Sequence, residues 1–222
     1  MSKQKISPKR LVVYVLGLFL LACGVSLSIR SSLGVAPVSS VALVLGNVLG
    51  VEVGNMTIAV FSVFVLIEIL LLRREFHWIQ LLQVPCAVLF GKFVTLSGVL
   101  FQGINPTGLA ARLLLILLAA LSSGAGVMCY LTARLIPNAA DGLVQVLSDK
   151  LGHSLSITKN VFDLVCVTFS TSVSLLVFHR LEGIGLGTVL MAILVGRALW
   201  LFTKLFGQAL ERFLYGEEQD AG

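Results

Sequence analysis

Two positively charged side chains lie inside apolar segments long enough to cross a lipid bilayer. Lys92 falls within residues 78–101, and Arg197 falls within residues 183–206. A charge near the middle of a membrane-spanning helix costs at least ~2.5–3.5 kcal/mol, so it requires a partner, a water-filled cavity or a function. The residues before each cation also match, Ala-Val-Leu-Phe-Gly-Lys against Ala-Ile-Leu-Val-Gly-Arg. The pattern indicates a duplicated site whose two cations could hold an anionic group.

The composition is that of an integral membrane protein. Of the 222 residues 57% are apolar and only 12% are charged, and the mean hydropathy is +1.00. Soluble domains average about 25% charged residues. The net charge of +5 is interpreted as topology, because the basic residues cluster at the ends of apolar runs. The expected environment is the lipid bilayer, and nucleic acid is not an expected partner.

Six stretches reach the ~20 residues needed to span the hydrocarbon core. They are 11–29, 56–72, 78–101, 111–131, 158–178 and 183–206. With both termini inside, eleven Lys and Arg residues fall on the cytoplasmic side and three on the outer side (Arg30, Arg112 and Arg180). This asymmetry follows the positive-inside rule. The sequence therefore predicts a bacterial cytoplasmic membrane protein with cytoplasmic N- and C-termini.

The two halves of the chain resemble each other at an offset of about 102 residues. Gly24-Val25 aligns with Gly126-Val127, and with three inserted residues Gly91-Lys92 aligns with Gly196-Arg197. Each half holds an odd number of spans, so the second copy must be inserted upside down. The predicted fold is an all-α polytopic membrane protein with six transmembrane helices in two inverted three-helix repeats, each with a short broken or re-entrant helix. The predicted boundaries are a tail (1–10), a first repeat (11–106), a second repeat (107–206) and a tail (207–222).

The two short apolar segments, 37–49 and 138–151, carry most of the other candidate binding residues. Each follows a break, Arg30–Ser40 with Gly34 and Pro37, and Arg134–Gly142 with Pro137. The free N–H groups at the start of each helix would suit an anion. These segments are either re-entrant or interfacial, a choice that the sequence leaves open. The candidate solute-binding residues are Lys92, Arg197, Arg30, Ser32, Ser39, Ser40, Asn138 and Asp141.

Acidic side chains in the spans are few. Asp163 follows Lys159 at i+4, a spacing that favours an ion pair on one helix face. Glu68 lies one turn before Arg73-Arg74, and snorkelling toward the interface could solvate it. Either carboxylate could instead neutralise Lys92 or Arg197, or carry a coupling proton.

No enzyme motif is present. The four cysteines (Cys23, Cys86, Cys129 and Cys166) lie singly in apolar segments, with no metal-binding spacing among them, and are interpreted as small buried side chains. We expect no catalytic residue, no metal and no cofactor.

The segment Gly24–Pro37, Gly-Val-Ser-Leu-Ser-Ile-Arg-Ser-Ser-Leu-Gly-Val-Ala-Pro, resembles the YczE/YitT-like family of bacterial membrane proteins. Its most specific parts are the Ser-Leu-Gly-x-x-Pro break (Ser32–Pro37) and the later Pro-x-x-x-Asp-Gly (Pro137–Gly142). The resemblance covers nearly the whole chain and implies a protein of the bacterial cytoplasmic membrane, commonly regarded as a transporter.

The sequence favours a small secondary transporter or exporter of an anionic or zwitterionic solute that works by alternating access. The alternative is a non-transporting membrane subunit, either for substrate capture or for assembly of a larger complex. A homodimer or a membrane partner subunit is compatible with both hypotheses.

Overall fold

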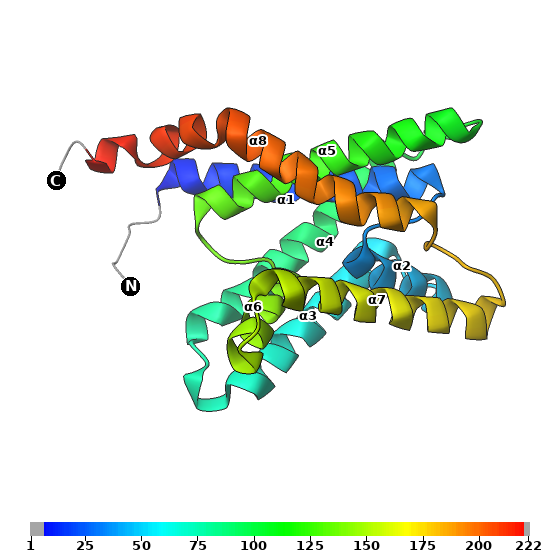
Figure 1. Cartoon of the computed structure of the whole chain (residues 1–222), viewed down its shortest axis with the longest axis horizontal. Coiled ribbons are helices and arrows are strands. Elements are labelled where there is room, and N and C mark those ends of the chain that lie inside the picture. The colour runs from blue at the N-terminus through cyan, green and yellow to red at the C-terminus, as the bar shows by residue number, and fades with distance from the viewer. Residues whose placement is uncertain (1–6, 220–222) are drawn as a thin grey trace.

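The structure is a computed structural model that describes residues 7–219, and every regular element in that range is helical. Six helical segments are long and apolar enough to cross a membrane, which confirms the predicted spans (Figure 1). The six helices are α1 (Pro8–Ser31), α3 (Val53–Leu72), α4 (Gln83–Leu100), α5 (Leu109–Ala133), α7 (Leu155–Phe178) and α8 (Leu186–Gln219). Two 3₁₀ turns, Arg73–Glu75 and Trp78–Leu82, join α3 to α4.

Two short helices interrupt this series at positions related by 102 residues. They are α2 (Pro37–Leu49) and α6 (Ala139–Leu151). The preceding long helix ends each time at a left-handed residue, Ser32 with φ 54° and Arg134 with φ 48°. Each short helix ends at a left-handed glycine, Gly50 with φ 65° and Gly152 with φ 67°, which glycine adopts without steric cost. The predicted short helices are therefore present.

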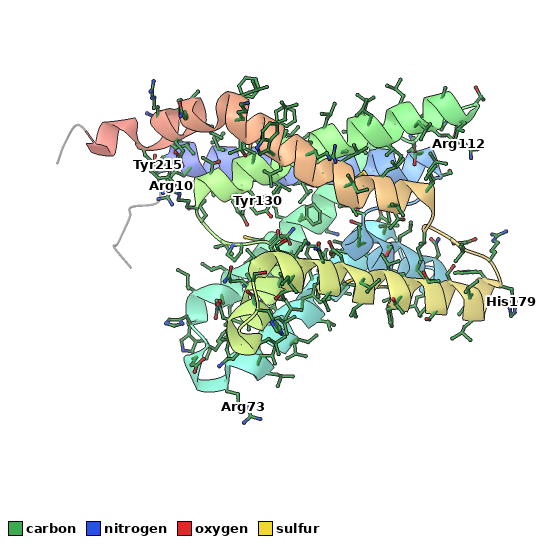
Figure 2. The ribbon with its side chains drawn as sticks, in the orientation of Figure 1. Arg10, Arg73, Arg112, Tyr130, His179 and Tyr215 are labelled. Atoms are coloured by element: carbon green, nitrogen blue, oxygen red, sulfur yellow. The ribbon has the colours of Figure 1, made fainter. Side chains whose placement is uncertain are left out.

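The ends of the described chain lie together. In Figure 1 the start of α1 and the end of α8 lie at the same end of the molecule, which we call the terminal end. The opposite end is called the distal end. Arg10 and Tyr215 lie at the terminal end, whereas Arg112 and His179 lie at the distal end (Figure 2). Helix α1 begins at the terminal end and α5 begins at the distal end, so the two halves of the chain start from opposite ends.

Helices α1 and α5 pack antiparallel along their length through small residues. A Cβ on Gly17 would lie 2.8 Å from the carbonyl oxygen of Gly126, and one on Gly126 would lie 2.6 Å from that of Gly17. Farther along the pair, a Cβ on Gly24 would lie 2.7 Å from the carbonyl oxygen of Ala119. Small residues allow this approach of two backbones, which gives van der Waals contact in a solvent that supplies no hydrophobic drive.

Helices α4 and α8 pack on this pair, whereas α2, α3, α6 and α7 pack mainly on one another (Figure 1). Helix α4 packs against α1 and α3, and α8 packs against α5. The short helices pack on long helices of the other half of the chain, α2 on α7 and α6 on α3. The Ser40 hydroxyl donates to the Ser170 hydroxyl at 2.9 Å across the first of these contacts, and Gly142 lies against Glu68 across the second.

Helix α8 continues beyond residue 206 through Gln219. Its last turns dock at the end of α5. The Tyr215 hydroxyl donates to the carbonyl oxygen of Thr132 at 3.0 Å, and Glu211 forms an ion pair with Arg134 at 2.9 Å. Carbonyl groups at a helix end have no partner within the helix, so Tyr215 satisfies one of them.

The α1–α5 contact gives a test of packing. We expect Gly126→Leu to destabilise the protein at the upper end of the ~1–3 kcal/mol that overpacking costs, because the new Cβ meets the α1 backbone at Gly17 and Leu21. Gly216→Leu is the matched control, since a Cβ there has no neighbour within 4 Å. Thermal unfolding in detergent should show a clearly lower melting temperature for Gly126→Leu and almost no change for Gly216→Leu. Equal melting temperatures would contradict the proposed tight contact.

Candidate functional site

A carboxylate is buried at the terminal end of the bundle, one turn before the end of α3. Glu68 is 0% exposed, and its only hydrogen bond among the described residues comes from the Gln83 amide nitrogen, at 2.9 Å. Its second oxygen, Oε1, is buried without a hydrogen-bond partner in that range. The snorkelling interpretation of Glu68 is therefore wrong. An ionised carboxylate buried without a cation is costly, so this site favours a bound proton or cation.

The start of α6 closes this site. A Cβ on Gly142 would lie 2.8 Å from Oε1 of Glu68 and 2.9 Å from the amide oxygen of Gln83. A side chain at position 142 would have to displace the ends of these two side chains. The glycine therefore allows the start of α6 to lie against the end of α3 and the start of α4.

The adjacent residue, Asp141, joins α6 to α5 and α7. The Tyr130 hydroxyl donates a short hydrogen bond to Oδ2 of Asp141. The ammonium group of Lys159 lies 3.6 Å from Oδ1 of Asp141 and 3.4 Å from Oδ1 of Asp163. The i,i+4 pair between Lys159 and Asp163 that the spacing favours is present. We call Glu68, Asp141 and Asp163, with Gln83, Tyr130 and Lys159, the acidic cluster; Lys159 pairs with the two aspartates, and the Gln83 amide donates to Glu68.

The structure does not bring together Lys92 and Arg197, the two cations within predicted membrane spans. Lys92 is exposed on α4 and donates to the amide oxygen of Asn55 at 3.1 Å. Arg197 is exposed on α8, and no hydrogen bond or ion pair within residues 7–219 joins it. The two helices pack mainly against different partners. Hydropathy along a helix gives the depth of a charge, whereas the side of the helix on which it lies depends on packing.

A cavity of about 310 Å³ lies at the distal end, between α1, α3 and α4. Arg30 of α1 and Glu52, the residue before α3, line it together with Thr95, Gly98 and Gln102. The Arg30 guanidinium donates to the carbonyl oxygen of Gly98 at 3.2 Å. Ligand sites are clefts of ≈ 300–1,000 Å³ with a few placed polar groups, so the cavity has the size and lining for a small solute.

A second hollow, of about 350 Å³, runs along α8. It is lined by Gly196, Leu199, Trp200, Thr203 and Lys204, and the Lys204 ammonium lies 5.1 Å from the centre of the Trp200 ring. A single helix supplies the whole lining. The hollow is therefore an open surface that another helix could cover.

The remaining predicted binding residues lie in the two breaks. Ser32 is exposed at the end of α1, Ser39 is half-buried, and Ser40 is buried against Ser170. Asn138 is half-buried at the start of α6, where its side chain makes no capping hydrogen bond. Of the predicted residues, the structure places Arg30 in the distal cavity and unites Asp141, Glu68 and Asp163 in the acidic cluster.

Sequence reasoning missed four residues of these sites: Glu52, Gln83, Thr95 and Tyr130. Each lies within an apolar helix or at its end, and none has a motif around it. Lys159 was considered only as an ion-pair partner of Asp163. A signal existed for Gln83, because a glutamine at the start of a span is expensive unless a partner is present. Within residues 7–219 no group of three or more His, Cys, Asp or Glu residues is arranged to hold a metal ion.

Comparison with known proteins gives a family and a relative. A family model described as a family of unknown function (DUF6198) matches residues 8–204. A protein of Bacillus subtilis (strain 168), named uncharacterized membrane protein YczE, is 27% identical over 192 residues, which cover 86% of this chain and 83% of that protein. The resemblance to YczE-like proteins is thereby confirmed. No solved structure matches at a significant level.

The carboxyl–amide pair can be tested by stability. We expect Gln83→Leu to cost about 1–3 kcal/mol, because it leaves the buried carboxyl of Glu68 without its donor. The double variant Glu68→Leu/Gln83→Leu should be less destabilised than Gln83→Leu alone, since removing both polar partners avoids the unsatisfied group. Gln208→Leu, at an exposed site on α8, is the control. Thermal unfolding of these three variants and of Glu68→Leu alone in detergent checks this, and additive losses in the double variant would refute the pairing.

Proposed function

Since the chain belongs to the DUF6198 family of unknown function, we propose that it is a small secondary transporter of an anionic or zwitterionic solute. In this proposal the two halves are inverted repeats, and one half moves against the other to give alternating access. The protein lies in a bacterial cytoplasmic membrane, with the terminal end in the cytoplasm. The charge asymmetry supports this orientation, because basic residues gather at that end.

The contacts between helices α1 and α5 support the inverted repeat. If the two halves are related by an offset of 102 residues, Gly24 corresponds to Gly126 and Ala119 corresponds to Gly17. A contact between Gly24 and Ala119 then requires a contact between Gly126 and Gly17. Both contacts are present, with Cβ-to-carbonyl distances of 2.7 Å and 2.6 Å. A two-fold axis in the membrane plane would pass between these helices, as in transporters built from inverted repeats.

The contacts of the short helices show the same correspondence between the two halves. Ser40 of α2 bonds to Ser170 of α7, and the corresponding pair is Gly142 of α6 with Glu68 of α3, which are also in contact. Each short helix therefore packs on the third helix of the other half at an equivalent place. Agreement at residue level between two unrelated sets of contacts favours duplication over chance similarity of apolar segments.

The observation that carries the transport proposal is a difference between equivalent helix pairs. A Cβ on Gly91 would lie 2.5 Å from the carbonyl oxygen of Gly54, so α4 is closed against α3. The equivalent Gly196 of α8 has no neighbour within 4 Å, and α7 makes no comparable contact with α8. The residues that line the α8 hollow correspond, at an offset of 105, to residues of α4 that line the distal cavity. Leu199, Trp200, Thr203 and Lys204 correspond to Val94, Thr95, Gly98 and Val99.

Two related halves in different states are what alternating access requires. In the second state, α8 closes on α7 as α4 now closes on α3, while α4 and α3 separate. Glu68 carries the coupling proton in this scheme, because it is buried with a single neutral donor.

The first test blocks the closure of α8. Proteoliposomes are assayed for uptake of labelled phosphate, succinate, glycine and alanine, with wild type beside Gly196→Leu. We expect uptake of at least one solute by the wild type and none by Gly196→Leu, because the added side chain fills the surface that α7 must reach. The variant should fold normally, since it meets no neighbour in this state.

Gly103→Leu, at another open position in the distal loop, is the control and should transport normally. The distance between spin labels at positions 157 and 204, in a chain without its four native cysteines, reports whether α7 and α8 are closed or open. This measurement needs no solute. Two distance populations are expected. One population together with no uptake by the wild type would contradict transport and favour the non-transporting subunit.

The second test concerns the coupling proton. We expect Glu68→Gln to exchange solute across the membrane but to lose accumulation driven by a pH gradient, because the amide mimics the protonated acid and cannot release a proton. Asp149→Asn, on the exposed face of α6, should accumulate solute normally. Measurement of uptake with and without an imposed pH gradient decides whether Glu68 carries the coupling proton. Gradient-driven accumulation by Glu68→Gln would remove Glu68 from the coupling step.

A further inference from the structure

The distal cavity contains two opposite charges that do not neutralise each other. Arg30 reaches it from the end of α1 and Glu52 from the residue before α3. No ion pair within 4.0 Å joins them, although both face the same space of about 310 Å³. Opposite charges that share a small cavity without pairing leave room for a molecule that carries both complementary charges.

Most of the donors of Arg30 are unused. A guanidinium group has five N–H donors in a planar fork that matches a carboxylate. Among the described residues, the side chain of Arg30 gives one hydrogen bond, to the carbonyl oxygen of Gly98. The residue is half-buried, so water screens its charge only in part. The remaining donors are available for an anionic group in the cavity.

The first turn of α3 adds further donors. The helical hydrogen bonds start with the Met56 amide, which donates to the carbonyl oxygen of Glu52 at 2.9 Å, and no side chain caps the N–H groups before it. These groups and the helix dipole favour an anion at this place. In addition, the hydroxyl of Thr95 is buried beside the cavity without a hydrogen-bond partner among the described residues.

Glu52 supplies the opposite charge on the rim of the cavity. Its carboxylate is exposed and accepts a bond from the Asn55 amide at 3.5 Å. The same Asn55 side chain accepts from Lys92 at 3.1 Å. Lys92 and Glu52 therefore bond to the same side chain, and the carboxylate of Glu52 keeps free acceptor positions for an ammonium group. A purely anionic ligand would be repelled by Glu52.

We propose that the distal cavity binds a small α-amino acid as its zwitterion. The ligand carboxylate lies between Arg30, the Thr95 hydroxyl and the first turn of α3, and the ligand ammonium lies against Glu52. The volume of the cavity restricts the side chain to a small one. This inference rests on the proposed transport function for its biological meaning, but binding itself is independent of transport.

The test is equilibrium binding to the purified full-length protein in detergent, measured by calorimetry and by thermal shift. The probes are glycine, alanine and serine, with propionate and ethylamine as analogues that each lack one charge. We expect the zwitterions to bind and to raise the melting temperature, whereas the two analogues do neither at the same concentration. Stabilisation by a ligand grows with its concentration over the dissociation constant, so a saturating series gives the affinity.

Arg30→Gln and Glu52→Gln should each weaken zwitterion binding roughly ten-fold or more, which equals about 1.4 kcal/mol. Arg112→Gln and Glu75→Gln, charge removals outside the cavity lining, are the matched controls and should leave the affinity unchanged. If Arg30→Gln does not fold, Arg30→Lys keeps the charge and removes the planar fork, and its weaker binding is equally diagnostic.

Three results would overturn the inference: no binding of any of the three amino acids, equal binding of propionate, or an unchanged affinity in Glu52→Gln. These outcomes are separable from failure of the proposed function. Zwitterion binding without uptake into proteoliposomes keeps the site and removes transport. Uptake of another solute without zwitterion binding keeps transport and removes this site.

Discussion

The approach of α1 to α5 through Gly17, Gly24 and Gly126 is the contact on which the rest of the structure depends. In a bilayer the apolar side chains gain little by leaving lipid, so the two halves are held by close packing and by polar groups satisfied within the protein. The α1–α5 contact places the two breaks, after Ser31 and after Ala133, at opposite ends of one helix pair. Each short helix is then positioned to pack on a long helix of the other half, and both polar sites are built on those short or broken segments.

The two ends of the molecule differ in the charged groups that they contain. At the terminal end, Asp141 and Asp163 share a single lysine, while Gln83 donates to Glu68 and Tyr130 donates to Asp141. At the distal end, Arg30 and Glu52 face one cavity without pairing. An uncompensated polar group in the membrane region costs stability, and a protein keeps such a group where a ligand or a proton completes it. The acidic cluster suits a proton or cation, and the distal cavity suits a zwitterion.

The sequence predicted the spans and the short helices well, because both follow from the length of apolar runs and from local breaks at glycine and proline. The 102-residue offset was visible in a few glycines, and the caps Gly50 and Gly152 follow it in the structure. The sites were predicted less well. Lys92 and Arg197 lie on exposed faces of their helices, and the position of a charge along an apolar run cannot give the direction of its side chain. Gln83 and Tyr130 matter through partners distant in sequence, which no local pattern predicts.

The similarity between the two halves at an offset of 102 residues does not extend to their charged side chains. Residues 102 positions after Arg30 and Glu52 are Thr132 and Ser154, so the second half has no charge pair. Residues 102 positions before Asp141, Lys159 and Asp163 are Ser39, Thr57 and Phe61, so the first half has no acidic cluster. In the transport cycle that we propose, the helices that exchange states are equivalent, because symmetry gives two conformations of similar energy. In the same proposal, different groups hold the solute and the proton. At the 102-residue offset the two halves thus share backbone contacts but not charged side chains.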